Sequence, residues 1–471
     1  MEMLTAKAAV EVRKRALVKT FEVVQQLART CPPANDEIRA RCIYCEKPGT
    51  HECSHCKSAR YCSQQCQDKD WSIHRLLCST HAEFTDDKRP SPDHARAIIF
   101  PAGDVQPRFI WIEKYAEGGY HFPVIDGWLG PYARYSNMIT DVNEVLNQAG
   151  HGHDVGHGLF LVGLNEHPLP EVPLNASILS LGKPGHMKVC FGNQIIAARK
   201  QNEAGTRGIT VDDVELRDLR HAVDFFQHHP MNPCVVNPER YTMPVMPGVI
   251  IHCDGSRQRL GPFGLQSPLE SVTIPRHCLE DLDIADGIHQ DACAGLLKLE
   301  LRWFYRRYSA HAEWLESETK GQSLRNKHAK HMVYQMRKRD NYCCLYPVRN
   351  AGTIVVFDQG GAPIDPAHIH AINDYFDEML KPSSHEYAAK VANGAVRRGL
   401  ARQPTSSTIH PTMEGFKAFW AGWKEQKEAS GTDLGDMASP YAIDGSFDEE
   451  ERNFMAEVFE VTVQCMRALA M

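Results

Sequence analysis

The sequence lacks a hydrophobic run long enough to cross a membrane. Its longest apolar stretch, 159–164, is of strand length, whereas a spanning helix needs roughly 18 to 20 residues. Basic residues between positions 13 and 19 interrupt any signal-peptide core. Leu17, Phe21 and Val24 recur at helical spacing. We therefore expect a helical N-terminal segment over 1–41 in a nuclear or cytoplasmic protein.

The sequence also lacks an excess of positive charge. It has 52 Lys and Arg against 59 Asp and Glu, a formal net charge of −7. This mildly acidic balance argues against attraction of the whole chain to nucleic acid or to an anionic membrane. Its 471 residues, 42% of them hydrophobic and 24% charged, are ordinary for a globular protein of two or three domains.

Three common catalytic motifs are missing as well. The sequence has no P-loop, no Gly-x-Gly-x-x-Gly that opens a helix after a strand, and no nucleophile elbow. We therefore expect that the protein is not an enzyme. The alternative is an enzyme whose site lies unrecognised in the body of the chain.

Cysteine is scarce outside one short cluster. Of 16 cysteines, seven lie between positions 42 and 78 together with His74, and the others are scattered, which excludes a disulfide framework. The clustered cysteines are Cys42, Cys45, Cys53, Cys56, Cys62, Cys66 and Cys78. Cysteines two or three residues apart hold one metal ion across a tight turn, and eight ligands complete two closed, structural zinc sites. Because the segment has few large apolar residues, metal binding must replace a hydrophobic core.

The second half of the cluster has the pattern of a helix. His74 and Cys78 are one turn apart, so both can bind one ion from the same face. Ser63 is a plausible N-cap. Asp68 and Asp70 follow near the helix start, where the helix dipole favours negative charge.

The residues around these ligands resemble a MYND-type zinc finger. Positions 59–63 read Ala-Arg-Tyr-Cys-Ser, and Cys66-Gln67 precede Asp70-Trp71 and His74. The resemblance implies a cross-brace with two structural Zn²⁺ ions. In that arrangement one ion takes Cys42, Cys45, Cys62 and Cys66, and the other takes Cys53, Cys56, His74 and Cys78.

The resemblance also implies a protein-interaction module. MYND fingers take short proline-containing peptides in a shallow groove, and the matching positions here are Trp71 and Gln67, with Ser54 as a weaker candidate. An aromatic face suits a proline ring. Trp71 could instead only pack within the finger. By analogy with the family, we expect an adaptor in transcriptional or developmental regulation.

A lysine methyltransferase is the enzyme class to weigh against this expectation, because one such group carries a MYND finger inside its SET domain. That arrangement needs SET sequence on both sides of the finger. Only 41 residues precede Cys42, and no Asn-His-Ser-Cys-like motif follows. We therefore expect that the protein is not a SET methyltransferase.

The rest of the chain alternates irregularly between helix-like and strand-like patterns. We predict a linker over 79–94, one mixed α+β body over 95–382, a linker or insertion over 383–411, and C-terminal helices over 412–471. The sequence thus predicts a small two-zinc cross-brace finger plus a larger mixed α+β domain with a helical C-terminus. No internal repeat is visible.

Individual elements of the body follow from short patterns. Apolar runs bounded by Pro or Gly predict strands over 97–100, 109–114, 176–181, 187–191, 248–253 and 354–357. Helical periodicity predicts helices over 211–227 and 286–318. Asp365 and Pro366 are typical of the cap and first residue of another helix.

The body is similar to the bodies of fungal proteins that carry an N-terminal MYND finger. The resemblance rests on Pro-Arg-Phe-Ile-Trp at 107–111, on the segment 212–226 with its Arg-His-Ala-Val-Asp-Phe-Phe ending, and on 361–368. It implies a class of protein and no particular activity.

One histidine-rich motif in the body has the residue types of a metal site. His151, His153 and His157 surround Asp154 between glycines, and imidazole with carboxylate suits zinc or iron. Because the glycines indicate a loop, a solvated histidine-rich loop is the interpretation that we favour over a third metal site.

Two charged patterns are likewise open to two interpretations. The tract 325–339 carries six Lys or Arg and no acidic residue, which suits nucleic-acid binding or nuclear import, but a solvated helix face is the interpretation that we favour. Asp212 and Asp213 resemble a paired carboxylate. Their place at the start of a predicted helix favours capping. A protein partner with a proline-containing motif remains the main expectation, with nucleic acid unlikely and no membrane partner.

Overall fold

The computed structural model describes part of the chain in enough detail to compare with these expectations. The described residues are 36–117, 120–129, 138–142, 157–163, 172–183, 186–187, 190–201, 209–227, 244–275, 293, 296, 299–307, 324–339, 342–347, 351–358, 360–392 and 411–443. The predicted helix in 1–41 lies mostly outside this set, as does the part of the predicted C-terminal helices beyond 443.

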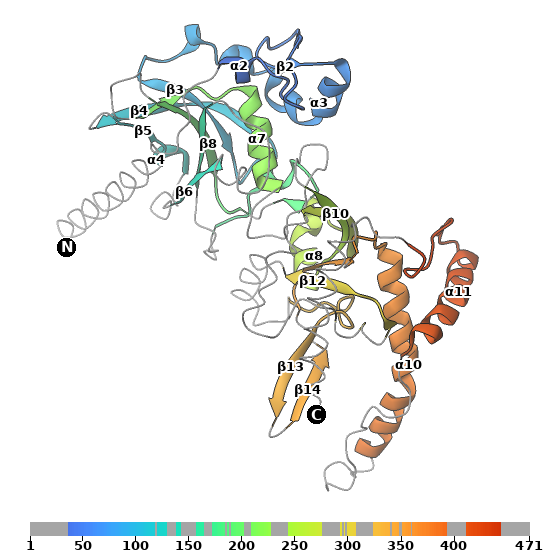
Figure 1. Cartoon of the computed structure of the whole chain (residues 1–471). Helices are drawn as coiled ribbons and strands as arrows, with labels where there is room; N and C mark the ends of the chain where they lie inside the picture. Colours follow the sequence, from blue (N-terminus) through green and yellow to red (C-terminus); the bar gives the residue numbers. More distant parts are fainter. Residues whose placement is uncertain are drawn as a thin grey trace, which may run out of the picture. The chain divides into compact units, whose positions relative to one another are not determined.

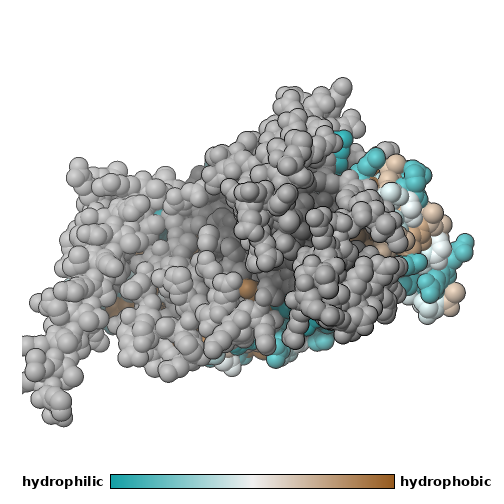
Figure 2. Space-filling view, turned by 90° about the horizontal axis from the view of Figure 1, so that it is seen from below, coloured by the Kyte–Doolittle hydropathy of each residue, from teal (hydrophilic) through white to brown (hydrophobic). Residues whose placement is uncertain are grey.

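The chain divides into two compact units. Unit 1 comprises 1–243 with 262–265, and unit 2 comprises 244–261 with 266–471. The α+β body predicted over 95–382 therefore spans both units. No helix in the described ranges is long and apolar enough to cross a membrane. The described surface at the right of Figure 2 intersperses hydrophilic with hydrophobic residues.

Unit 1 contains the cysteine cluster and a mixed α+β fold (Figure 1). Its described helices are α2 (Asp36–Arg39), α3 (Gln64–Cys78), η1 (His81–Glu83), η2 (Asp86–Lys88), α4 (Asp126–Leu129), α6 (Ala176–Leu179) and α7 (Leu216–Gln227). Its strands are β1 (His51–Glu52), β2 (Arg60–Tyr61), β3 (His94–Phe100), β4 (Arg108–Glu117), β5 (Tyr120–Val124), β6 (Met138–Asp141), β7 (Gly158–Gly163), β8 (Gln194–Gln201) and β9 (Ile209–Asp212). The large sheet has the order β5-β4-β3-β8-β7-β6, with β9 paired to β8.

The two faces of this sheet bury different side chains, as strand alternation requires. Ala97 and Ile99 of β3 join a core cluster with Leu129 of α4 on one face. Phe100 points to the other face, where its ring lies 5.1 Å from that of Phe226. Helix α7 therefore covers this second face (Figure 1).

Unit 2 is built on a four-stranded antiparallel sheet of order β11-β10-β15-β12. Its strands are β10 (Val245–Ile251), β11 (Leu269–Pro275), β12 (Trp303–Arg307) and β15 (Ile354–Asp358), with a separate hairpin of β13 (Tyr334–Arg339) and β14 (Tyr342–Pro347). Its described helices are α8 (Asp254–Leu260), α10 (Pro366–Ala392) and α11 (Met413–Ala429). The short helix η5 (Gly261–Phe263) follows α8 and falls mostly in the stretch 262–265 of unit 1. Ile372 of α10 and Trp420 of α11 join the core cluster that contains Val249 and Val356.

Several predicted elements are confirmed. Strands occur over 97–100, 109–114 and 354–357, and β10 covers most of 248–253. Helix α10 begins at Pro366, and the Asp365 carboxylate accepts a hydrogen bond from the Ala367 amide at 2.8 Å. These are the places where local pattern and tertiary packing agree.

Other predicted elements are wrong. The helix predicted over 286–318 contains strand β12, because Trp303 and Tyr305 alternate into the sheet core. The strand predicted over 176–181 is helix α6, since the Asn175 side chain caps it. Helix α10 continues through Ala392, so the start of 383–411 is helical and is no linker, which leaves the alternative of an insertion. The predicted helix over 211–227 begins only at Leu216.

The predicted linker 79–94 packs against the large sheet. The Phe84 ring lies 5.6 Å from Phe109 and 5.5 Å from Trp111, and the Arg89 guanidinium lies 5.1 Å above the Trp111 ring. Arg89 also donates hydrogen bonds of 2.9 and 2.6 Å to the two carboxylate oxygens of Asp213. A bidentate pair of this kind holds both groups in a defined geometry.

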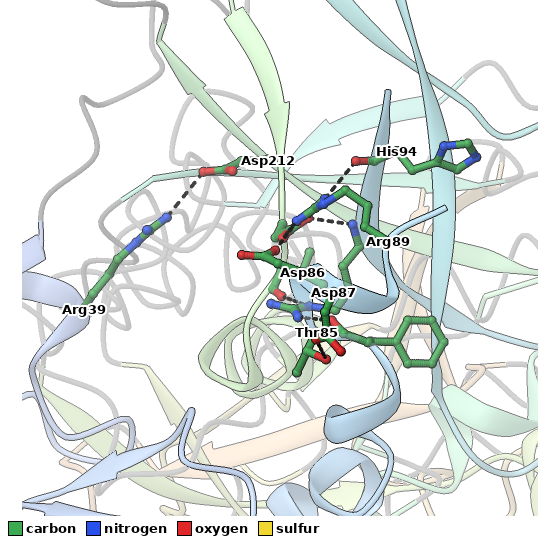
Figure 3. Close-up of polar contacts among 11 residues, drawn as sticks. Arg39, Thr85, Asp86, Asp87, Arg89, His94 and Asp212 are labelled. Carbon is green, nitrogen blue, oxygen red and sulfur yellow. Dashed lines mark hydrogen bonds and ion pairs between the residues drawn. The ribbon is translucent and has the colours of Figure 1, made fainter. Parts of the chain in front are cut away.

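Asp212 and Asp213 are not helix caps, contrary to the interpretation favoured by the sequence. Asp213 accepts a hydrogen bond from the Arg96 backbone amide at 2.8 Å in addition to those of Arg89. Asp212 lies 3.5 Å from Arg39 (Figure 3). Both carboxylates therefore join segments that are distant in sequence.

We predict that Asp213→Asn destabilises unit 1 by about 2 kcal/mol at pH 7, because it leaves the Arg89 guanidinium partly unpaired. Burial opposes ionisation of Asp213, but the Arg89 hydrogen bonds outweigh it and hold the pKa of that carboxyl below its usual range. Because the pKa of Asp213 is lower in the folded state, its ionised carboxylate stabilises the fold at pH values above the unfolded-state pKa of about 3.9. This stabilisation is lost as the pH falls through the folded-state pKa.

Urea unfolding at pH 7 and near pH 3 tests this prediction. The difference between wild type and Asp213→Asn should shrink at the lower pH. Asp86→Asn is the matched control, because Asp86 also pairs with Arg89 but is 88% exposed, and it should change stability little. Equal effects of the two substitutions would contradict the prediction.

Candidate metal centre

The first two cysteine pairs sit in turns of the same geometry. The Glu46 amide donates to the Cys42 carbonyl at 3.0 Å, and the Lys57 amide donates to the Cys53 carbonyl at 3.0 Å. Glu46 and Lys57 both have left-handed backbone conformations, with φ of 62° and 59°. This conformation costs about 1–2 kcal/mol for a residue other than glycine, so the surrounding structure must hold each turn in place.

Helix α3 supplies the remaining ligands in a fixed arrangement. Ser63 is its N-cap, as predicted, and its hydroxyl accepts a hydrogen bond from the Cys66 amide at 3.3 Å. Cys66 stands in the first turn, and His74 and Cys78 stand one turn apart at the end of the helix. Helix and turns therefore bring together ligands that are far apart in sequence.

The eight ligands form two sets. Cys42, Cys45, Cys62 and Cys66 make site 1, and Cys53, Cys56, His74 and Cys78 make site 2. Within each set all ligand atoms lie within 4.8 Å of one another. Consecutive pairs of ligands thus alternate between the sites, which is the cross-brace that the resemblance implied.

The donor sets fit two structural zinc ions. Sulfur–sulfur distances in site 1 include 3.4 Å for Cys45–Cys62 and 3.5 Å for Cys62–Cys66. In site 2 the Cys53 and Cys78 sulfurs are 3.8 Å apart. A zinc tetrahedron with Zn–S distances of about 2.3 Å has edges of about 3.8 Å. Four protein ligands complete each site, so neither keeps a position for a reactive water.

The protonation states of the ligands make zinc binding depend on pH. Burial lowers the pKa of His74, against the smaller opposing effect of Asp70, so its imidazole is neutral at pH 7 and can bind zinc. Burial raises the pKa of the Cys45 and Cys78 thiols to about 12. Zinc must therefore displace their protons, so the affinity of the sites for zinc decreases as the pH falls.

A buried carboxylate between the ligands of α3 connects site 2 to the rest of unit 1. Asp70 is 1% exposed and accepts a hydrogen bond from the Tyr61 hydroxyl at 2.9 Å. Its other oxygen lies 3.0 Å from Nε of Arg220 on α7. The edge of the Tyr61 ring lies against His74, with a centroid distance of 5.9 Å. Asp70 is therefore a buried ion-pair partner, and its predicted role at the helix start is wrong.

Further charged pairs attach the finger to α7. Arg217, 2% exposed, lies 3.5 Å from Glu46 and donates to the Arg41 carbonyl at 2.5 Å. The Arg220 guanidinium also lies 5.7 Å above the Tyr44 ring. Because these arginines are buried and paired, the finger is a fixed part of unit 1.

The sequence patterns did not reveal that Asp70, Arg217 and Arg220 take part in the contacts between the finger and α7. Arg217 and Arg220 are one turn apart on a helix whose residues from Leu216 to Phe226 are all buried. Two arginines beside the apolar residues Leu216, Leu219, Val223 and Phe226 of this helix are the signal that could have indicated a buried acidic partner. Nothing in the sequence identifies that partner as Asp70.

The predicted peptide-binding residues lie on the accessible side of the finger. Trp71 is 48% exposed, and the Trp71 and His74 ring centroids are 5.9 Å apart. Gln67 is half-buried one turn earlier on α3, and Ser54 is exposed in the second knuckle. Gln67 and Trp71 thus share one helix face.

His157 is not part of a solvated loop, contrary to the interpretation that we favoured. Its side chain is fully buried, with Nε2 3.0 Å from Asp218. Burial opposes protonation, but the Asp218 carboxylate outweighs it and raises the pKa of His157. His151 and His153 lie outside the described residues. Among the residues that the structure describes, only sites 1 and 2 bring three or more potential ligands together.

The basic tract 325–339 is not a helix face. It begins with turns and continues as strand β13, which pairs with β14. The Lys330 ammonium group donates hydrogen bonds of 2.6 and 2.5 Å to the two carboxylate oxygens of Asp377. One of the six basic side chains is therefore neutralised within unit 2.

Comparisons with known proteins concern the finger. The family model described as MYND finger matches residues 42–78. N-lysine methyltransferase SMYD2 is 40% identical over 50 residues in Rattus norvegicus and 42% identical over 52 residues in Homo sapiens, which is 11% of this chain and 12% of each relative. Ubiquitin carboxyl-terminal hydrolase 19 of Arabidopsis thaliana is 55% identical over 40 residues, 8% of this chain and 6% of the relative. The chain thus spans about an eighth of the methyltransferases that it matches, and no solved structure matches it.

We predict that Cys78→Ala reduces the zinc content from two ions to one or fewer per chain, because a closed site with three ligands binds zinc weakly. Native mass spectrometry measures the content directly. Cys253→Ala is the matched control, since Cys253 is equally buried but belongs to neither site. Two zinc ions retained by Cys78→Ala would contradict the assignment of site 2.

We predict that Asp70→Asn destabilises unit 1 by about 3–5 kcal/mol, because it leaves Arg220 buried without its charge partner. Asp68→Asn is the matched control on the same helix. Asp68 is exposed, so its substitution should have little effect. Urea unfolding with zinc in excess compares the two variants, and equal stabilities would show that the Asp70–Arg220 pair does not attach the finger.

Proposed function

We propose that this protein is a zinc-dependent protein-interaction adaptor whose finger reads short proline-containing peptides. We further propose that it acts in the nucleus or cytoplasm, in transcriptional or developmental regulation, and has no catalytic activity of its own. The closed zinc sites support a non-catalytic finger, because they leave no coordination position for water or substrate. The finger also resembles parts of two proteins named for different activities, a methyltransferase and a ubiquitin hydrolase. This supports a binding role that is separate from catalysis.

The observation that carries the proposal is the placement of Trp71. One side of its ring is held near the ligand His74, yet the side chain remains 48% exposed. An aromatic ring that is fixed in place and accessible loses little conformational entropy when it binds a partner. Proline suits such a ring because both groups are rigid and apolar. Gln67, one turn away, can hydrogen-bond the peptide backbone.

We propose that the short hairpin of the finger forms the other half of the peptide groove. His51 and Glu52 of β1 are both exposed, and β1 pairs only with β2 in a two-stranded sheet among the described residues. An extended peptide that adds to such an edge gains main-chain hydrogen bonds, while side-chain pockets supply specificity. The direction of the peptide along this edge is set by the partner.

Attachment to α7 gives the finger a fixed position within unit 1. The buried pairs of Asp70 with Arg220 and of Glu46 with Arg217 lie on the side that faces α7. The exposed Trp71 is not used in these contacts. The proposed groove therefore remains accessible while the finger is attached.

The test is binding of the full-length chain to a display library of peptides with one fixed proline. We expect Trp71→Ala to weaken binding of the selected peptides by at least about thirtyfold, as truncation of a central aromatic anchor does. Gln67→Ala should weaken it less. Tyr115→Ala is the matched control, because Tyr115 is a 49% exposed aromatic residue on β4 of the same unit.

Zinc content must be measured for every variant, so that a damaged finger is not mistaken for a lost contact. If Trp71→Ala keeps two zinc ions and binds the peptides as the wild type does, Trp71 only packs within the finger. A pull-down from host extract whose partners are unchanged by Gln67→Ala/Trp71→Ala would lead to the same conclusion. The function would then lie in the body.

A further inference from the structure

The two units share one arrangement of strands. Unit 1 contains the neighbours β4-β3-β8-β7, and unit 2 contains β11-β10-β15-β12. All of these neighbours are antiparallel. The chain also visits them in the same order in each unit. In each unit the chain first forms a hairpin, which is β3–β4 in unit 1 and β10–β11 in unit 2. The outer strand follows, β7 or β12, and then the central strand, β8 or β15. A helix comes last, α7 in unit 1 and α10 in unit 2.

The register of the two central strands is also the same. In unit 1 the last residue of β3, Phe100, lies opposite the first residue of β8, Gln194. In unit 2 the last residue of β10, Ile251, lies opposite the first residue of β15, Ile354. Since a shift of one residue would turn every side chain to the other face, the agreement extends to which residues are buried under the helix.

In unit 1 a buried asparagine joins the end of β3 to the residues just before β8. Asn175 is 0% exposed, and its side-chain amide donates hydrogen bonds of 2.7 Å to the carbonyls of both Phe100 and Gly192. Its side-chain oxygen accepts a hydrogen bond from the Ile178 amide at 2.8 Å. Both amide hydrogens and the oxygen are therefore satisfied.

Asn326 makes the same contacts in unit 2. It is 1% exposed and donates hydrogen bonds to the carbonyls of Ile251 at 3.0 Å and Gly352 at 2.7 Å. Its oxygen accepts a hydrogen bond from the Ala329 amide at 3.1 Å. Each asparagine stands 75 residues after the end of its first strand.

Two further details agree at the same place. Gly192 and Gly352, whose carbonyls the asparagines bind, both have left-handed φ angles, 63° and 71°. The residue after each glycine then accepts a hydrogen bond through its side-chain oxygen. Asn193 accepts from the Ala102 amide at 2.9 Å and Thr353 from the Cys253 amide at 3.2 Å, and each of these amides lies two residues beyond its strand.

The covering helices pack on the same strand positions. Phe226 of α7 contacts Phe100 in unit 1. In unit 2 the corresponding Ile251 shares a core cluster with Ile372 and Phe376 of α10. The matched face of each sheet is therefore buried by the matched helix.

We propose that the chain contains two copies of one α+β module, over about 94–227 and 245–376, each held together by one buried asparagine. The module explains why these polar residues are buried where apolar ones are usual. The copies differ in what they carry. Copy 1 carries the zinc finger through Asp70 and Arg220. Copy 2 carries α11, through contacts such as that of Tyr375 with Phe416 at 5.4 Å.

The repeat escapes sequence inspection for a physical reason. Most of the matched strand positions are apolar in both copies but few are identical, because any apolar side chain of suitable size can fill them; Gln194, which matches Ile354, is an exception. The spacing from asparagine to glycine also differs, at 17 residues in copy 1 and 26 in copy 2. The hairpin β13–β14 accounts for the longer spacing, since it lies between Asn326 and Gly352.

Hydrogen–deuterium exchange of the full-length chain tests the equivalence. We expect Asn175→Ala to speed exchange of the Ile178 amide and of the ends of β3 and β8 by at least tenfold, and to leave unit 2 unchanged. Asn326→Ala should do the same for the Ala329 amide and the ends of β10 and β15. Asn373→Ala is the control, because Asn373 is also buried but, within the described ranges, donates only to the His328 carbonyl, at 2.8 Å, and it should leave β10 and β15 unchanged.

Opening of the strand ends by only one of the two asparagine variants would overturn the proposal, as would an effect of either variant on the other unit. If a variant does not fold, a crystal structure of the wild-type chain decides. Asn175 and Asn326 must then bridge the same two carbonyls in their respective units, and any other arrangement of Asn326 would overturn the equivalence. Neither result depends on whether the finger reads peptides.

Discussion

One buried carboxylate connects the zinc centre to the rest of unit 1. Asp70 stands between Cys66 and His74, which belong to different zinc sites, and it contacts Tyr61 within the finger and Arg220 outside it. A buried charge without its partner is very costly. The zinc ligands fix Asp70 in place, and Asp70 in turn requires Arg220. Metal binding and attachment to α7 are therefore coupled through Asp70, and the Glu46–Arg217 pair adds a second contact to the same helix.

This coupling bears on how the proposed adaptor would work. Short zinc fingers joined by a polar linker are expected to move independently. Here the segment after α3 packs through Phe84 on the large sheet and pairs Arg89 with Asp213. The finger is thus held at α7 and by the chain that follows it. A peptide bound at Trp71 would meet a groove with a fixed orientation within unit 1.

The sequence predicted the metal ligands well and the contacts around them poorly. Zinc ligands repeat at short spacings that chemistry dictates, so Cys42 to Cys78 were recognisable without a structure. Asp70, Arg217 and Asp213 act through partners that are distant in sequence, and local patterns carry no information about such pairs. The helix predicted over 286–318 failed for a related reason. Leu296, Leu299 and Trp303 recur at helical spacing, but tertiary packing places Trp303 in a strand.

Because local patterns carry no information about distant contacts, the sequence of the body revealed neither a function nor the proposed repeat. Buried polar residues such as Asn175 and Asn326 are not visible as a motif, since each needs carbonyls that folding brings to it. The contacts that both copies share maintain the module, whereas the features that differ are specific to one copy. The finger with its arginine partners, and α11 with its aromatic residues, belong to the second category. Function is therefore to be sought in these additions, where the two copies differ.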